Sequence, residues 1–118
     1  MIEIDGMMGE GGGQVLRSSL TLSLLTGTPV RLTRIRAGRA KPGLRHQHRM
    51  AVQAAACISG ACVEGDRIGS QELYFSPGVV VPGSYHFDIG TAGSTSLVLQ
   101  TVLLPLAMAA GESRLHIC

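Results

Sequence analysis

The chain has 118 residues, of which 45% are apolar and only 15% charged, with a formal net charge of +2. This composition excludes a disordered tail, which would be polar and rich in charge, and the length allows one small domain at most. Glycine is the unusual component, since its 16 residues are about twice the usual share and predict turns at specific places.

Hydrophobic patterning predicts alternating strands and helices along the chain. Residues 1–5 and 30–36 alternate apolar and polar side chains, as strands do, and helical patterns follow over residues 14–25 and 44–59. Short strands are expected at residues 62–64, 71–76, 84–89 and 114–118, and a third helix over residues 95–110. We therefore predict a mixed α/β fold in which one mixed sheet packs against helices.

Two of these helices carry further predictions. The leucines of the first helix lie around most of its circumference, which predicts burial on several sides. The third helix belongs to an uncharged stretch, residues 89–111, that contains Gln100, Pro105 and three glycines. We expect this stretch to be a buried helix rather than a membrane span, because polar and helix-breaking residues interrupt it.

The cysteines and the first residues bear on the compartment. Three cysteines without a paired spacing favour a reducing environment over a disulfide framework. The start of the chain is acidic and lacks the basic segment of a signal peptide. We therefore expect a cytoplasmic protein.

Basic residues gather in one part of the chain. No acidic residue lies between Glu10 and Glu64. Arginine presents a planar fork that binds phosphate oxygens in pairs, and this interval is rich in it. Without neutralising acids nearby in sequence, the interval favours contact with phosphate or nucleic acid over a merely solvated basic surface. Its basic residues are Arg17, Arg31, Arg34, Arg36, Arg39, Lys41, Arg45 and Arg49.

Two glycine-rich loops, over residues 9–13 and 90–94, each connect a predicted strand to a predicted helix. Glycines let the backbone approach a ligand, and a helix N-terminus favours an anion; a tight structural turn is the alternative for each loop. Glu10 lies inside the first loop, where a carboxylate repels phosphate unless a divalent cation lies between them.

Polar residues follow the second strand and enter the second helix. Arg36 and Arg39 flank a glycine at a strand end, where a turn would direct both at one phosphate. Gln47 and His48 lie near the positive end of the next helix. His46 and His48 are two residues apart and point to different helix faces, so we expect surface or hydrogen-bonding roles rather than metal ligation.

Together these segments resemble the N-terminal part of the RNA 3'-terminal phosphate cyclase family. Each matching run is weak alone, but the set follows the family's order and spacing over essentially the whole chain. The matching runs are residues 9–17, 35–44, 69–71 and 92–101.

The resemblance implies a ligase that forms phosphoric ester bonds: it converts the 3'-phosphate of an RNA end into a 2',3'-cyclic phosphate with ATP. A histidine attacks the α-phosphate of ATP, AMP passes to the RNA 3'-phosphate, and the neighbouring 2'-OH displaces it. The expected cofactors are ATP and a divalent metal, Mg or Mn. By matching position, the resemblance implies that Glu10 binds the metal and that Gln100 and Arg17 bind ATP. The residues that it implies for phosphate or RNA binding are Arg36, Arg39, Gln47 and Gln14.

The same resemblance implies a longer parent chain of repeated strand–helix units, in an architecture shared with enolpyruvyl transferases. Residues 1–118 would form a single domain, the first of these units, as an N-terminal fragment. The family's nucleophilic histidine is expected downstream, so we assign no catalytic residue here and expect the fragment alone to be inactive.

Three alternatives remain open at this point. One is the non-catalytic, cyclase-like branch of the family that serves in ribosome biogenesis; the others are an enolpyruvyl transferase and a free-standing basic module that binds RNA. The presence of the expected ligand residues favours the enzyme. Its expected partners are RNA 3'-phosphate ends and ATP, with a homo-oligomer left open.

Overall fold

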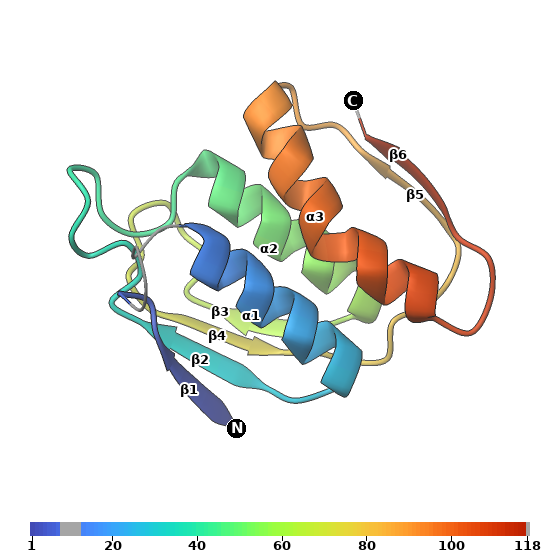
Figure 1. Cartoon of the computed structure of the whole chain (residues 1–118), viewed down its shortest axis with the longest axis horizontal. Helices are drawn as coiled ribbons and strands as arrows, with labels where there is room; N and C mark the ends of the chain where they lie inside the picture. The colour runs from blue at the N-terminus through green and yellow to red at the C-terminus, as the bar shows by residue number, and fades with distance from the viewer. Residues whose placement is uncertain (8–12, 118) are drawn as a thin grey trace.

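The computed structural model describes residues 1–7 and 13–117 (Figure 1). Within this part, six strands and three helices follow the predicted order. The strands are β1 (Ile2–Asp5), β2 (Val30–Thr33), β3 (Cys62–Glu64), β4 (Leu73–Ser76), β5 (Ser84–Phe87) and β6 (Arg114–Ile117), and the helices are α1 (Gly13–Thr26), α2 (His46–Ser59) and α3 (Ala92–Met108).

The predicted fold class is confirmed, but the described strands form two sheets instead of one. The larger sheet has the order β1-β2-β4-β3 and is mixed, because β1 and β2 are parallel and the other neighbours antiparallel. Strands β5 and β6 pair in parallel in a second sheet. Pro77 and Pro82 lie between β4 and β5, and proline has no N–H to donate to a neighbouring strand. The connection is attached to the end of α2 by a hydrogen bond of 2.9 Å from Val81 N to Ile58 O.

Alternating residues of the central strands face the helices. Val30 and Leu32 of β2, and Leu73 and Phe75 of β4, are all at most 2% exposed. Figure 1 shows α1 and α2 in front of this sheet, and α3 packs against both helices. The core is thus mainly aliphatic and lies between the four-stranded sheet and the helices.

The leucines of α1 are only partly buried. Leu16, Leu20 and Leu24 form a stripe at a spacing of four residues, and this stripe enters the core. Leu22 is 60% exposed and Leu25 is 38% exposed. The prediction that α1 is buried on several sides is therefore wrong, because its other leucines fall outside the stripe.

Helix α3 continues through Pro105, which has no N–H to donate to the carbonyl of Thr101 four residues earlier. The hydroxyl of Thr21, on α1, donates to that carbonyl oxygen at 3.0 Å. This bond replaces the missing helical one and fixes α3 against α1. None of the helices in the described part of the chain combines the length and the hydropathy that a membrane span requires.

We predict that Thr21→Val lowers the free energy of unfolding by about 1–2 kcal/mol, because it leaves a buried carbonyl without a donor. In a Pro105→Ala background the same substitution should cost clearly less, since residue 105 then supplies the helical N–H. Urea denaturation of the four proteins of this double-mutant cycle measures the difference. Thr26→Val, at an exposed helix end, is the matched control; equal costs in both backgrounds would contradict the interpretation.

Candidate functional site

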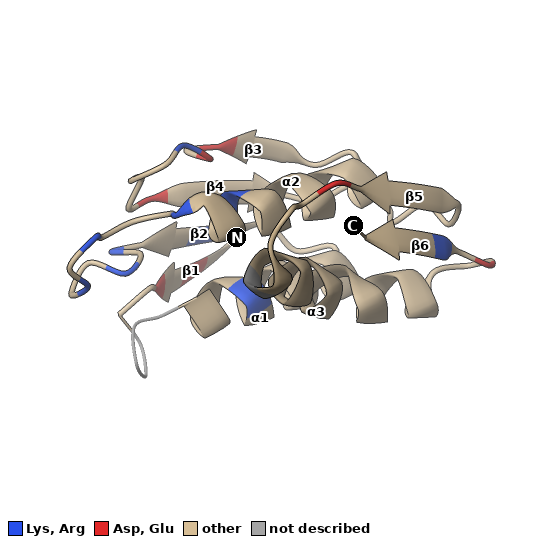
Figure 2. Ribbon diagram, turned by 90° about the horizontal axis from the view of Figure 1, so that it is seen from above, with Lys and Arg blue, Asp and Glu red and all other residues tan. Residues whose placement is uncertain are grey.

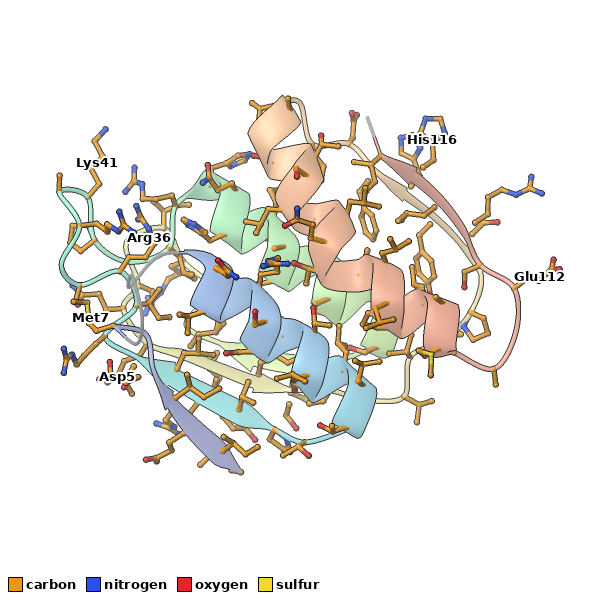
Figure 3. The ribbon with its side chains drawn as sticks, viewed as in Figure 1. Asp5, Met7, Arg36, Lys41, Glu112 and His116 are labelled. Atoms are coloured by element: carbon orange, nitrogen blue, oxygen red, sulfur yellow. The ribbon has the colours of Figure 1, made fainter. Side chains whose placement is uncertain are left out.

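The segment after β2, residues 34–43, folds into a projecting loop that we call the basic loop. Arg34 and Arg36 adopt left-handed backbone conformations, with φ of 53° and 49°. Nη1 of Arg36 donates to the carbonyl oxygens of Lys41 at 2.8 Å and Gly43 at 2.9 Å. The Arg36 guanidinium therefore closes the loop on itself (Figure 3).

The base of the basic loop is anchored to residues 69–71. Gly43 has φ of 80°, and a Cβ at this position would collide with the carbonyl of Gly69. Leu44 N donates to Ser70 O at 2.9 Å, and Ile35 N donates to Gln71 O at 2.9 Å. This contact gives residues 69–71, one of the runs that resemble the family, a structural function: they hold the basic loop in place.

The start of α2 is organised by His48, which is only 3% exposed. Its Nδ1 accepts a hydrogen bond of 3.0 Å from the backbone N–H of Arg45, the N-cap residue. The bond assigns the imidazole proton to Nε2. Nε2 lies against the first residue of α1, because a Cβ added at Gly13 would stand 2.7 Å from it. His48 thus joins the starts of α1 and α2.

The charge state of His48 follows from its surroundings. Burial, followed by the positive charges of Arg36 and Arg45, lowers the pKa of His48 from 6.5 to about 4. At neutral pH the ring is therefore uncharged, with a hydrogen-bond donor at Nε2. The prediction that His48 has a hydrogen-bonding role is confirmed.

A pocket of about 320 Å³ opens where the three helices meet. Helices α1 and α2 contribute residues from their first turns, and α3 contributes residues from its first half. Nε2 of Gln100 donates to Oγ of Ser96 at 3.4 Å. The lining residues are Gly13, Gln14, Arg17, Gln47, His48, Ser96, Leu97 and Gln100.

The chemistry of this pocket suits an anion. Its described lining contains no acidic residue, one arginine and the amides of three glutamines. The N-terminal ends of α1 and α2 add partial positive charge, because the backbone N–H groups of a first helical turn point toward the helix start. Together these groups form a donor set that fits phosphate oxygens.

The pocket gathers four of the seven residues predicted as ligand contacts, Gln14, Arg17, Gln47 and Gln100. Arg36 is not part of the lining but is close enough to lower the pKa of His48, and exposed Arg39 belongs to the basic loop. Glu10, the predicted metal ligand, lies outside the described residues. In the part that is described, no three His, Cys, Asp or Glu side chains are placed to hold a metal ion.

Two polar side chains of the pocket, those of His48 and Ser96, were not predicted as ligand contacts. The signal for His48 was its place three residues after the N-cap Arg45, where a side chain can accept the cap N–H and point toward the helix start. For Ser96 the sequence held a weaker signal, the spacing of four residues to Gln100, which puts both on one helix face.

A second hollow, of about 350 Å³, lies on the opposite face of the four-stranded sheet. Its centre is Arg31, whose guanidinium stands 5.8 Å from the centroid of the Tyr74 ring. The acidic residues Glu64 and Glu72 share this lining. Mixed charge makes it a poorer phosphate site than the pocket at the helix starts.

We predict that the free energy of unfolding falls by about 2 kcal/mol between pH 7 and pH 5 through His48 alone. An unfolded histidine takes up a proton near pH 6.5 while the folded one does so only near 4, so lower pH favours the unfolded state. His48→Asn keeps an acceptor for the N-cap N–H and should flatten the pH dependence. Denaturation at several pH values tests this, with exposed His46→Asn as control; parallel curves for wild type and His48→Asn would refute it.

Comparison with known proteins identifies the family of the chain. The family model of the RNA 3'-terminal phosphate cyclases matches residues 8–118. The chain is 64% identical over 112 residues to the RNA 3'-terminal phosphate cyclase of Ralstonia nicotianae, an alignment that covers 95% of this chain and 32% of that relative. The chain thus spans about a third of the length of the curated relative that it matches. A family match over nearly the whole chain, at this identity, means that the chain belongs to the RNA 3'-terminal phosphate cyclase family.

Proposed function

We propose that this chain supplies the N-terminal part of an ATP-dependent enzyme that converts RNA 3'-phosphate ends into 2',3'-cyclic phosphates. The observation that carries the proposal is the pocket at the helix starts, which combines Arg17, two helix N-termini and several neutral donors. The family membership of the chain supports the reaction class, an RNA-processing ligase.

The proposed reaction proceeds in three transfers. A histidine nitrogen attacks the α-phosphorus of ATP, a P–N bond forms, and pyrophosphate leaves. A phosphate oxygen of the RNA 3'-end then attacks the same phosphorus, and the histidine leaves. Finally the 2'-OH attacks the 3'-phosphate and loses its proton, and AMP departs. The cyclic ester can form because adenylation has made AMP a good leaving group.

In this proposal the pocket residues bind and orient phosphates. Arg17 and Gln100 contact ATP, Gln14 and Gln47 contact phosphate or RNA, and the helix N-termini offset the negative charge that accumulates. The Nε2–H of His48 is aimed at the start of α1, on the same side as these groups, and adds a donor that stays neutral above about pH 4.

Arg36 and Arg39 are proposed to hold the RNA phosphate from the side of the basic loop. Among the described residues, both hydrogen bonds from Arg36 run through Nη1 to loop carbonyls, which leaves Nε and Nη2 as donors for a phosphate. The guanidinium would then act both as the closure of the loop and as an anion contact.

We also propose that Glu10 helps to hold a divalent metal, Mg or Mn. The bound cation would neutralise the charge of the triphosphate. The support is chemical: Glu10 precedes Gly13, a residue of the pocket lining, by three positions in the sequence, and a carboxylate that comes near bound phosphate requires a cation between the two charges.

The described histidines support a nucleophile elsewhere in the protein. The lone pair of His48 at Nδ1 is occupied by the N–H of Arg45, and its Nε2 carries the proton. Exposed His46, at the start of α2, does not line the pocket, and neither do His86 on β5 and His116 on β6. We therefore propose that the nucleophilic histidine belongs to a part of the enzyme beyond this chain.

We predict that the full-length parent protein acquires an acid-labile label when it is incubated with α-labelled ATP and magnesium, whereas residues 1–118 alone do not. Arg17→Ala should lower the adduct yield at limiting ATP at least about tenfold, because a desolvated arginine–phosphate contact is lost. Arg114→Ala, which removes an equal charge from β6, is the matched control. An unlabelled full-length protein would favour the non-catalytic ribosome-biogenesis alternative, and labelling of the short chain would overturn the placement of the nucleophile.

A separate prediction concerns Glu10. Glu10→Ala should raise the magnesium concentration needed for half-maximal adenylation several-fold and leave the thermal midpoint of the metal-free protein unchanged. Metal titrations of adduct yield, with Glu112→Ala as an exposed control, make the comparison. A magnesium dependence identical to that of wild type would contradict a metal-binding role.

A further inference from the structure

The basic loop places positive charge beyond the pocket. Figure 2 shows Lys and Arg residues along this loop at one end of the molecule, and Figure 3 shows Lys41 pointing away from the ribbon. Lys41 is exposed and does not line the pocket. A single phosphate in the pocket would therefore leave the charge at the loop tip unused.

The loop is fixed in shape before any ligand binds. The Arg36 guanidinium joins its two ends, Gly43 fits tightly against Gly69, and the N–H of Gly38 lies 3.3 Å from Sδ of Met7. A ligand that binds this loop has to order little additional backbone. The conformational entropy lost on binding is therefore small, and it reduces the affinity of a charged contact little.

Positive groups connect the pocket to the loop tip. Burial, followed by the charges of Arg39 and Arg45, lowers the pKa of Arg36, so these three cations lie close enough to repel one another. One described acid offsets part of this charge, through an ion pair of 3.3 Å between Arg34 and Asp5. A row of mutually repelling cations is favourable once a polyanion lies along it.

We propose that the basic loop binds the sugar–phosphate backbone of the RNA nucleotides that precede the 3'-end, with Lys41 contacting a phosphate outside the reacting site. The inference rests on the proposed function for the position of the RNA end. A polyanion with regularly spaced phosphates is the ligand that can occupy the pocket and the loop tip together. The loop contains no aromatic side chain on which a base could stack. The proposed contact is therefore to phosphates and does not depend on the base sequence.

The test compares two RNA lengths in the full-length protein. Dinucleotide and decanucleotide RNAs, each with a fluorescent 5'-end and a 3'-phosphate, are titrated by anisotropy at several salt concentrations. Lys41→Ala should weaken decanucleotide binding about three- to fivefold and reduce the magnitude of the slope of log K against log salt by about 0.7. Dinucleotide binding and self-adenylation should stay at wild-type values. Arg114→Ala removes the same charge from exposed β6 and should change none of these quantities.

Three results would overturn the inference: wild-type decanucleotide binding by Lys41→Ala, an equal loss for both RNA lengths, or the same loss with Arg114→Ala. The self-adenylation assay separates this inference from the proposed function. A protein that binds RNA through Lys41 but does not self-adenylate would retain the loop contact and refute the enzyme. A protein that self-adenylates but binds RNA independently of Lys41 would support the enzyme and refute the loop contact.

Discussion

The candidate site depends on one buried imidazole. His48 accepts the N-cap N–H of α2 through Nδ1 and rests against Gly13 of α1 through Nε2. The two helix starts therefore approach closely, and their positive ends point into one pocket. This arrangement needs a ring that is neutral at physiological pH, and burial with the nearby charges of Arg36 and Arg45 keeps it so by lowering its pKa. A protonated ring would lose the Nδ1 acceptor and add a third cation.

The third wall of the pocket is positioned by a different contact. Pro105 removes a helical donor from α3, and Thr21 of α1 replaces it. Because Arg17 lies one turn before Thr21, and Gln100 directly precedes Thr101, this bond lies next to both residues and helps to hold them at one pocket. Pro105 thus leaves open the carbonyl through which α1 holds α3 beside the two proposed ATP contacts.

Local patterns predicted most of the fold, and contacts between distant segments account for what they missed. Alternation and helical periodicity located all the elements, since these signals depend on neighbouring residues. The pairing of β5 with β6 joins segments about 30 residues apart, and nothing within either strand specifies it. The burial of His48 likewise depends on Gly13, far earlier in the chain. The proposed binding residues came from resemblance and charge, whereas the loop closure by Arg36 required coordinates because its partners are backbone carbonyls.

The groups that meet in the pocket determine which part of the reaction this segment can perform. Cations, amides and helix N-termini stabilise phosphate charge, but none of the described pocket residues offers an unprotonated nitrogen or a carboxylate for attack or proton removal. A surface of this kind orients phosphates and does not attack them. The basic loop extends the same chemistry outward, with its cations held in place by a backbone closed on itself. Binding and neutralisation are therefore the proposed share of this segment, and the proposed nucleophile is a histidine outside this chain.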